Sequence, residues 1–192
     1  MATSHEMLRK LGLNFVVGFG FILSTIILTA ILGSTLGVSI AGDIRDIGTG
    51  LAGMDAMIIG VSALGFILTG GLVYVWAKAR KPIAKWMGYD VSDAPKLNNK
   101  GKITPILATL FAVGIIASVI IYGFTQLLAG LSPDIELSSI TTLLDAVMTM
   151  NPMLIAGSFV AIVAFGWVVG LLGQAIDPVS KRVDQSKVIP KR

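Results

Sequence analysis

The chain has 192 residues, of which 54% are apolar and 14% charged, and its formal net charge is +4. Its mean hydropathy of +0.84 leaves too little polar surface to coat a soluble globule of this length, which excludes that class and indicates a membrane protein. Cysteine is absent, which excludes disulfide scaffolds, thiolate metal sites and cysteine nucleophiles.

Four apolar stretches are long enough to cross a hydrocarbon core of roughly 30 Å, which takes about 20 residues of helix. None of them contains Asp, Glu, Lys, Arg or His. Because every backbone polar group in lipid must be satisfied within its own segment, we expect helices rather than strands. The prediction is an all-α integral membrane protein with transmembrane helices at about residues 11–38, 56–77, 104–130 and 152–173.

Basic residues are distributed very unevenly between the loops. The N-terminus, the connector between the second and third helices, and the C-terminal tail hold 14 of the 15 Lys and Arg residues. The other two loops, at about 39–55 and 131–151, hold only Arg45 together with six acidic residues. Because Lys and Arg are enriched in cytoplasmic loops, we expect both termini and the connector on the cytoplasmic or interior side.

The two halves of the chain match each other at a constant offset of 96 residues, without a gap. The alignment gives 16 identities, among them Gly18 with Gly114, Gly70 with Gly166 and Pro82 with Pro178. We interpret residues 1–96 and 97–192 as tandem two-helix hairpins, the first followed by the basic connector and the second by the basic tail. Both copies would insert in the same direction, as a parallel repeat about the membrane normal. The alternative is that four-helix membrane proteins resemble one another at this level.

The outer loops carry apolar residues at helical spacing. Ile140, Leu143, Leu144, Val147 and Met148 form one such face, and the first half places Ile44, Ile47, Leu51 and Ala52 at corresponding positions. We predict a short amphipathic helix in each outer interface. A plain loop with an apolar bias remains the alternative.

Residues suited to catalysis or metal binding are nearly absent from the sequence. His5 is the only histidine, and it has no partner at the spacing of a metal site. Pumps and ion pathways usually place ionisable residues inside the bilayer, whereas this chain places its acids in the loops. We therefore predict no enzyme activity, no catalytic residues, no metal and no cofactor.

Small residues spaced four apart allow helix backbones to approach closely. The predicted helix-packing residues are Gly65, Thr69, Ala108, Ala112, Gly157, Ala161, Gly166 and Gly170. The spacing does not separate packing within one chain from association between chains.

The basic side of the protein would attract anionic lipid headgroups or nucleic-acid phosphates. The predicted contact residues are Lys78, Arg80, Lys81, Lys85, Lys96, Lys100, Lys102, Lys181, Arg182, Lys187, Lys191 and Arg192. Membrane topology alone is the alternative explanation for their position.

The segment "TLLDAVMTMNP", residues Thr142 to Pro152, introduces the last hydrophobic helix, which a basic end follows. In outline, each hairpin resembles the small coat proteins of spindle-shaped archaeal viruses. The resemblance implies a hairpin embedded in the host membrane and then in the lipid-containing virion shell, with basic ends toward DNA. This chain departs from the family pattern because it joins two such units through a longer basic connector.

We therefore expect a self-associating structural membrane protein, a capsid protein on the favoured hypothesis. Its expected partners are the lipid bilayer, further copies of the chain, and DNA or anionic lipid on the basic side. A small transporter or channel, or an accessory subunit of a larger membrane complex, is the alternative function.

Overall fold

The computed structural model describes residues 4–36, 50, 52–53, 55–91, 95–97, 102–131 and 152–185. It contains four long helices, α1 (Ser4–Leu36), α3 (Ala56–Trp86), α4 (Ile103–Leu131) and α6 (Pro152–Gln185), and no strand among these described residues. Each helix is long and apolar enough to cross a membrane. The chain is therefore an all-α integral membrane protein, as its hydropathy predicts.

Two helices extend well beyond their predicted ends. We expected the second helix to end near residue 77 and the fourth near residue 173, but α3 continues through Pro82 and α6 through Pro178. A proline inside a helix removes the hydrogen bond to the carbonyl four residues earlier. Both prolines follow the apolar stretch, in a polar part of the helix where water can bind the freed carbonyl. Both helices therefore continue past prolines that lie beyond the ends predicted from hydropathy.

Helix α3 has a defined cap at each end. At its start, the Asp55 carboxylate accepts hydrogen bonds from the backbone amides of Met57 at 2.9 Å and Ile58 at 3.2 Å. At its end, Gly88 has a φ of 69°, in the left-handed region that favours glycine. The Gly88 carbonyl accepts a hydrogen bond from Arg9 Nη1 at 2.8 Å. This bond joins the start of α1 to the end of α3.

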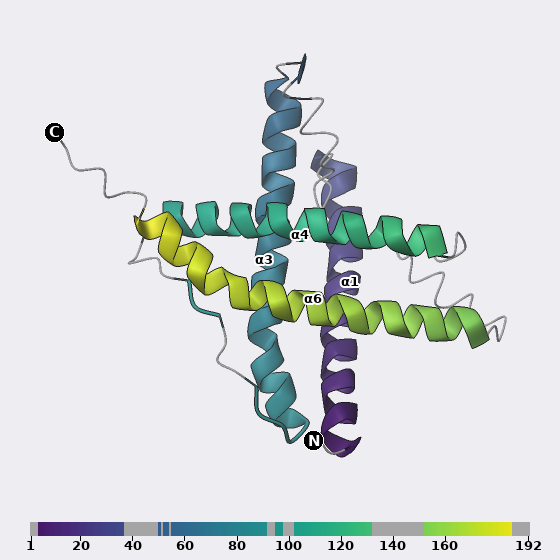
Figure 1. Ribbon diagram of the computed structural model, residues 1–192. Helices are drawn as coiled ribbons and strands as arrows, with labels where there is room; N and C mark the ends of the chain where they lie inside the picture. The colour runs from purple at the N-terminus through teal and green to yellow at the C-terminus, as the bar shows by residue number, and fades with distance from the viewer. Residues whose placement is uncertain are drawn as a thin grey trace.

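The helices form two layers that lie crosswise (Figure 1). In one layer α1 and α3 run antiparallel, and in the other α4 and α6 run antiparallel. The most extensive contacts lie between the layers, where α1 packs on α6 and α3 packs on α4. Each half of the chain thus packs more closely against the other half than within itself.

The core lies between the two layers and receives side chains from all four helices. In α1, Leu13, Val17 and Phe21 are buried at a spacing of four residues, which places them on one helix face. The buried apolar residues contributed by the other helices include Val73, Ala77, Val113, Ala117, Val169, Leu172 and Ile176.

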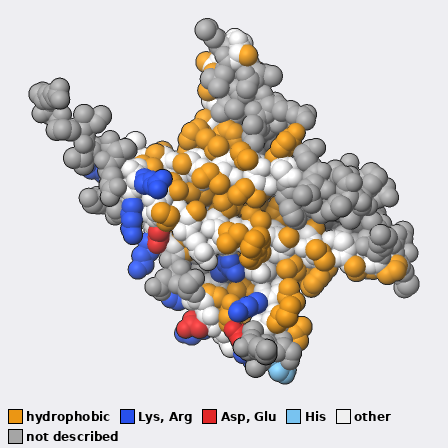
Figure 2. All heavy atoms as spheres, viewed as in Figure 1, with side chains coloured by type: hydrophobic (Ala, Val, Ile, Leu, Met, Phe, Trp, Pro, Cys, Tyr) orange, Lys and Arg blue, Asp and Glu red, His pale blue; other side chains and the backbone are white. Residues whose placement is uncertain are grey.

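Charged side chains gather at one end of the molecule, over the last turns of α3 and α6 and the start of α1 (Figure 2). Most of the remaining described surface in this view is apolar. Large apolar side chains are exposed along the described helices, including Val160, which is 65% exposed, and Trp167, which is 56% exposed. The amphipathic helices predicted for the outer loops fall almost wholly outside the described residues.

Candidate functional site: two helix crossings and a polar cleft

Helices α1 and α6 cross with their backbones in direct contact. A side chain on Gly18 of α1 would overlap the carbonyl oxygen of Ile162, and a side chain on Gly166 of α6 would overlap the carbonyl oxygen of Asn14. Only glycine at both positions leaves room for this approach.

Helices α3 and α4 cross in the same way. A side chain on Gly70 of α3 would overlap the carbonyl oxygen of Leu110, and a side chain on Gly114 of α4 would overlap the carbonyl oxygen of Phe66. Each of these four residues lies 96 positions from its counterpart at the first crossing, because Gly18 pairs with Gly114, Gly70 with Gly166, Asn14 with Leu110 and Phe66 with Ile162.

The geometry of both crossings indicates a weak hydrogen bond at every glycine. In glycine, a Cα–H bond points where the Cβ of another residue would lie, so each glycine directs a hydrogen at a carbonyl oxygen of the facing helix. Contacts of this Cα–H···O type recur at helix interfaces and contribute about 0.5–1 kcal/mol each. Close approach also gains dispersion energy, which matters in lipid because lipid tails are as apolar as the helix side chains.

An aromatic pair accompanies each crossing. The rings of Phe15 and Phe159 stack between α1 and α6 with centroids 5.1 Å apart, and those of Phe66 and Phe111 meet edge to face between α3 and α4 at 5.9 Å. Pairs of this kind contribute roughly 0.5–1.5 kcal/mol beyond the area they bury.

Within the first layer, Trp76 Nε1 donates a hydrogen bond to Ser24 Oγ at 3.1 Å.

The predicted helix-packing residues take different positions. Gly65, Thr69, Ala161, Gly166 and Gly170 are buried, Ala112 and Gly157 are half-buried, and Ala108 is exposed. The Thr69 hydroxyl donates to the carbonyl of Gly65 in its own helix at 2.9 Å. Of these residues, Gly166 lies at a backbone contact and Gly170 lies one turn further along α6, beneath an arginine.

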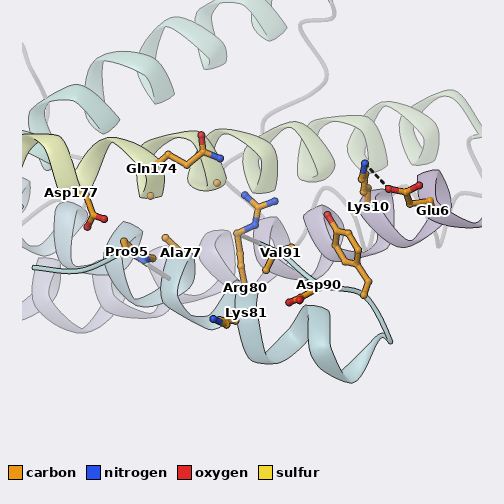
Figure 3. A pocket seen from close by; sticks show the side chains of 13 residues that line it. Glu6, Lys10, Ala77, Arg80, Lys81, Asp90, Val91, Pro95, Gln174 and Asp177 are labelled. Carbon is orange, nitrogen blue, oxygen red and sulfur yellow. Dashed lines mark ion pairs between the residues drawn. The ribbon is translucent and has the colours of Figure 1, made fainter. Parts of the chain in front are cut away.

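That arginine is Arg80, near the end of α3. Val73, Ala77 and Ala84 are buried on one face of the helix, and Arg80 occupies the same face between them. Its Nη2 donates a hydrogen bond to Asn14 Oδ1 of α1 at 3.0 Å. Its Nη1 lies so close to Gly170 of α6 that any side chain at that position would overlap it. Figure 3 shows the guanidinium directed from α3 toward α6.

Arg80 lines a cleft of about 690 Å³ between α1, α3, α6 and the segment that follows α3. The charged residues around it include Glu6, Lys10, Lys81, Asp90 and Asp177 (Figure 3). Lys10 Nζ lies 3.2 Å from Glu6 Oε1, and Asp177 Oδ1 accepts a hydrogen bond from the backbone amide of Lys96 at 2.6 Å. Within the described ranges, no Asp or Glu oxygen lies within 4.0 Å of the Arg80 guanidinium.

The other predicted basic contact residues lie mostly on the surface. Lys78, Lys81, Lys85, Lys96, Lys102, Lys181 and Arg182 are exposed, Arg80 is half-buried, and Lys100, Lys187, Lys191 and Arg192 fall outside the described residues. Lys78 Nζ lies 5.8 Å from the centre of the Tyr74 ring. In the described part of the chain, no group of three or more His, Asp or Glu side chains is placed to hold a metal ion.

Gly18, Gly70 and Gly114 were not predicted as site residues. Gly18 and Gly70 have no small residue four positions away, so a search for small residues at that spacing does not find them. The signal that marks the glycines is the offset of 96, at which Gly18 matches Gly114 and Gly70 matches Gly166. Asn14 is marked by its polarity within an apolar stretch, which suits it to a hydrogen bond between helices, but its partner Arg80 is distant in sequence.

Comparison with protein-family models, with curated proteins and with solved structures finds no match for this chain. The fold and the site therefore define the class by themselves. The protein is an integral membrane protein whose described residues form four long helices, with two glycine-mediated helix crossings and a polar cleft at the charged end.

Two neighbouring glycines test the α3–α4 crossing. Gly70→Ala places a methyl group against the Leu110 carbonyl, so we expect it to lower the free energy of unfolding by about 1–3 kcal/mol, as overpacking does. Gly71→Ala meets nothing within 4 Å and should leave stability unchanged or raise it by up to about 1 kcal/mol, because alanine favours a helix over glycine. Denaturation in mixed detergent micelles would measure both, and equal effects would contradict the crossing.

Proposed function

We propose that the protein is a self-associating structural component of a lipid-containing assembly, a coat protein embedded in a bilayer. In this proposal its basic end contacts DNA or another polyanion. The observation that carries the proposal is the separation of charge: charged side chains gather at one end of a body whose remaining visible described surface is mostly apolar (Figure 2). A coat needs such a body to contact lipid and neighbouring copies, and a charged end to meet what it encloses.

We also propose that the two halves are tandem copies of one hairpin. Several identical pairs at the offset of 96 are buried in both halves, namely Val17 with Val113, Ser62 with Ser158, and Val73 with Val169. The two crossings use matching glycines and matching carbonyls. A general resemblance between membrane helices accounts for shared hydropathy, but it gives no reason for matched backbone contacts.

The arrangement of the layers supports a membrane normal that runs from the charged end to the opposite end. An axis in that direction, between the layers, exchanges α1 with α4 and α3 with α6 (Figure 1). Helices of 29 to 34 residues are roughly 45–50 Å long at a rise of about 1.5 Å per residue. They exceed a hydrocarbon core of about 30 Å, and crosswise tilting accommodates the excess.

Self-association is supported by small residues on the outside of α4. Ala108 is exposed and Ala112 is half-buried, although their spacing is that of a close helix contact. Exposed apolar side chains continue along this helix at Ile116, Val119 and Ile120. A second copy that packs on this side would use the small residues that packing within the chain leaves exposed.

The alternative function, a small transporter or channel or an accessory subunit, is favoured by one observation. Ionisable side chains between membrane helices often belong to transport pathways, and Arg80 is half-buried between α1, α3 and α6. The cleft around it is at the charged end, however, and the residues that follow inward on α3, Ala77 and Val73, are buried and apolar.

The proposed topology predicts the labelling of two single cysteines in a chain that has none of its own. Ile103, at the start of α4, and Met57, at the start of α3, are both exposed. In intact oriented vesicles, a membrane-impermeant maleimide should label Ile103→Cys and Met57→Cys from opposite sides, with Ile103→Cys on the side of the termini. Labelling of both variants from the same side would contradict the four-helix topology.

The proposed polyanion contact predicts a steep dependence of DNA binding on salt. The exposed residues Lys78, Lys81 and Lys85 lie at the charged end of α3. Replacing all three with Gln should weaken duplex DNA binding and reduce the log–log slope by about 0.9 for each phosphate that the variant no longer neutralises, whereas replacing them with Arg should preserve the slope. Fluorescence polarisation between about 50 and 200 mM salt would measure the slope, with the protein in zwitterionic nanodiscs.

The native material decides between the two functions. Large ordered lipid-containing particles of this one chain around DNA are the expected result, visible by electron microscopy. A discrete complex with a catalytic or transport partner, together with no affinity for nucleic acid, would overturn the proposal in favour of the alternative.

A further inference from the structure

We propose that the cleft between α1, α3 and α6 binds the phosphate group of a membrane phospholipid, and that the Arg80 guanidinium is its principal contact. This inference depends on the protein lying in a bilayer, and its comparison between the two halves rests on the proposed duplication. It does not depend on a coat function or on contact with DNA, so either proposal can fail while the other stands.

Among the described residues, the hydrogen-bonding capacity of Arg80 is only partly used. A guanidinium has five N–H donors and a permanent positive charge, and Asn14 Oδ1 accepts one of those hydrogen bonds at 3.0 Å. A half-buried charge is costly unless an opposite charge compensates it. Since no carboxylate of the described chain lies within 4.0 Å, an anionic ligand would supply the missing partner.

Helix packing does not require a charged group at this position. The position 96 residues after Arg80 is Ile176, which is 0% exposed in the core. The counterparts of Asn14 and Gly170 are Leu110 and Tyr74. The three elements of the Arg80 site therefore differ together from the other half, although the glycine crossings beside them are matched. The first half has the charged Arg80 where the second half has the well-packed, apolar Ile176. This difference indicates a function that only the first half has.

The position of Arg80 along α3 also suits a contact with lipid phosphate. Arg80 follows the apolar stretch of α3, with the buried Ala77 on one side along the helix and the exposed Lys81 and Lys85 on the other. With the apolar stretch in the hydrocarbon, as the proposed topology places it, Arg80 lies at the level of the headgroups, where lipid phosphates lie. The cleft is lined by apolar as well as polar groups, including Val91, Pro95, Tyr89 and Gln174. Such a lining suits a headgroup together with the upper part of its chains.

The chemistry of the guanidinium favours phosphate. Its planar fork donates two parallel hydrogen bonds to two oxygens of one phosphate, an arrangement that a lysine ammonium does not reproduce. The cleft is lined by the basic Lys10 and Lys81 but also by Glu6, Asp90 and Asp177, and Lys10 is paired with Glu6. The fork of the guanidinium, and not a net positive potential, would therefore select phosphate. DNA is the less favoured source of the phosphate, because Arg80 is enclosed by three helices while the lysines that reach solvent lie farther out.

Native mass spectrometry of the full chain, released from nanodiscs, tests the proposal. The probes are phosphatidylglycerol and a galactosyl diacylglycerol with the same acyl chains but no phosphate. We expect the wild-type protein to retain phosphatidylglycerol about tenfold more tightly than the galactolipid, and Arg80→Gln to lose that preference, since hydrogen bonds to a charged group are worth about 1.5–3 kcal/mol. The control Val75→Ala changes an exposed side chain of the same helix that does not line the cleft, and it should keep the preference.

A second variant guards against misfolding of Arg80→Gln. Gly170→Ala keeps every charge but places a methyl group where the guanidinium lies, so it should also reduce the preference, and Arg80→Lys should restore it only in part. Unchanged helical circular dichroism would show that each variant is folded. Equal preference in the wild type and in a folded Arg80→Gln or Gly170→Ala would overturn the proposal. Displacement of the lipid by millimolar inorganic phosphate would assign the site to a soluble anion, and displacement by duplex DNA would assign it to nucleic acid; either result would overturn the lipid assignment.

Discussion

Direct backbone contact between helices is the constraint on which the rest of the structure depends. Within a bilayer no hydrophobic force drives one apolar helix against another, so association must come from close packing and weak hydrogen bonds. Glycines at the two crossings allow that contact. The α1–α6 crossing also builds the cleft: the Asn14 carbonyl lies on Gly166, the Asn14 side chain is thereby presented to Arg80, and Gly170, one turn further, leaves room for the guanidinium. One structural feature thus determines both the packing of the layers and the position of the polar site.

Hydropathy was sufficient to predict four helices, but not how they pack. Helices that are apolar on nearly every side have no polar face to show which side is buried, so the crosswise layers had no signal in the sequence. Small residues four apart selected Gly166 and Gly170, which are buried, and also Ala108, which is exposed. That spacing does not select Gly18 and Gly70, because a close contact needs only one small residue on each helix when the two helices cross steeply.

Arg80 was predicted only as one member of a basic group, and ending the second helix near residue 77 hid its special position. Once α3 is continued through Pro82, helical spacing places Arg80 on the face that buries Val73, Ala77 and Ala84. The neighbouring Lys78 and Lys81 fall on exposed sides of the same turns. Which of several basic residues is buried thus depends on the helix face on which each one lies. That face cannot be assigned when the helix is predicted to end before these residues.

Solid-state NMR of the protein in lipid bilayers would test the two crossings most directly. With the glycine Cα and backbone carbonyl carbons isotopically labelled, the contacts predict through-space correlations from Gly18 to Ile162, from Gly114 to Phe66, and from Gly70 to Leu110. Correlations at both crossings, together with their absence for Gly60 and Gly71, which face open space, are the result this structure predicts. Glycines at these crossings that instead correlate with lipid acyl chains would contradict it.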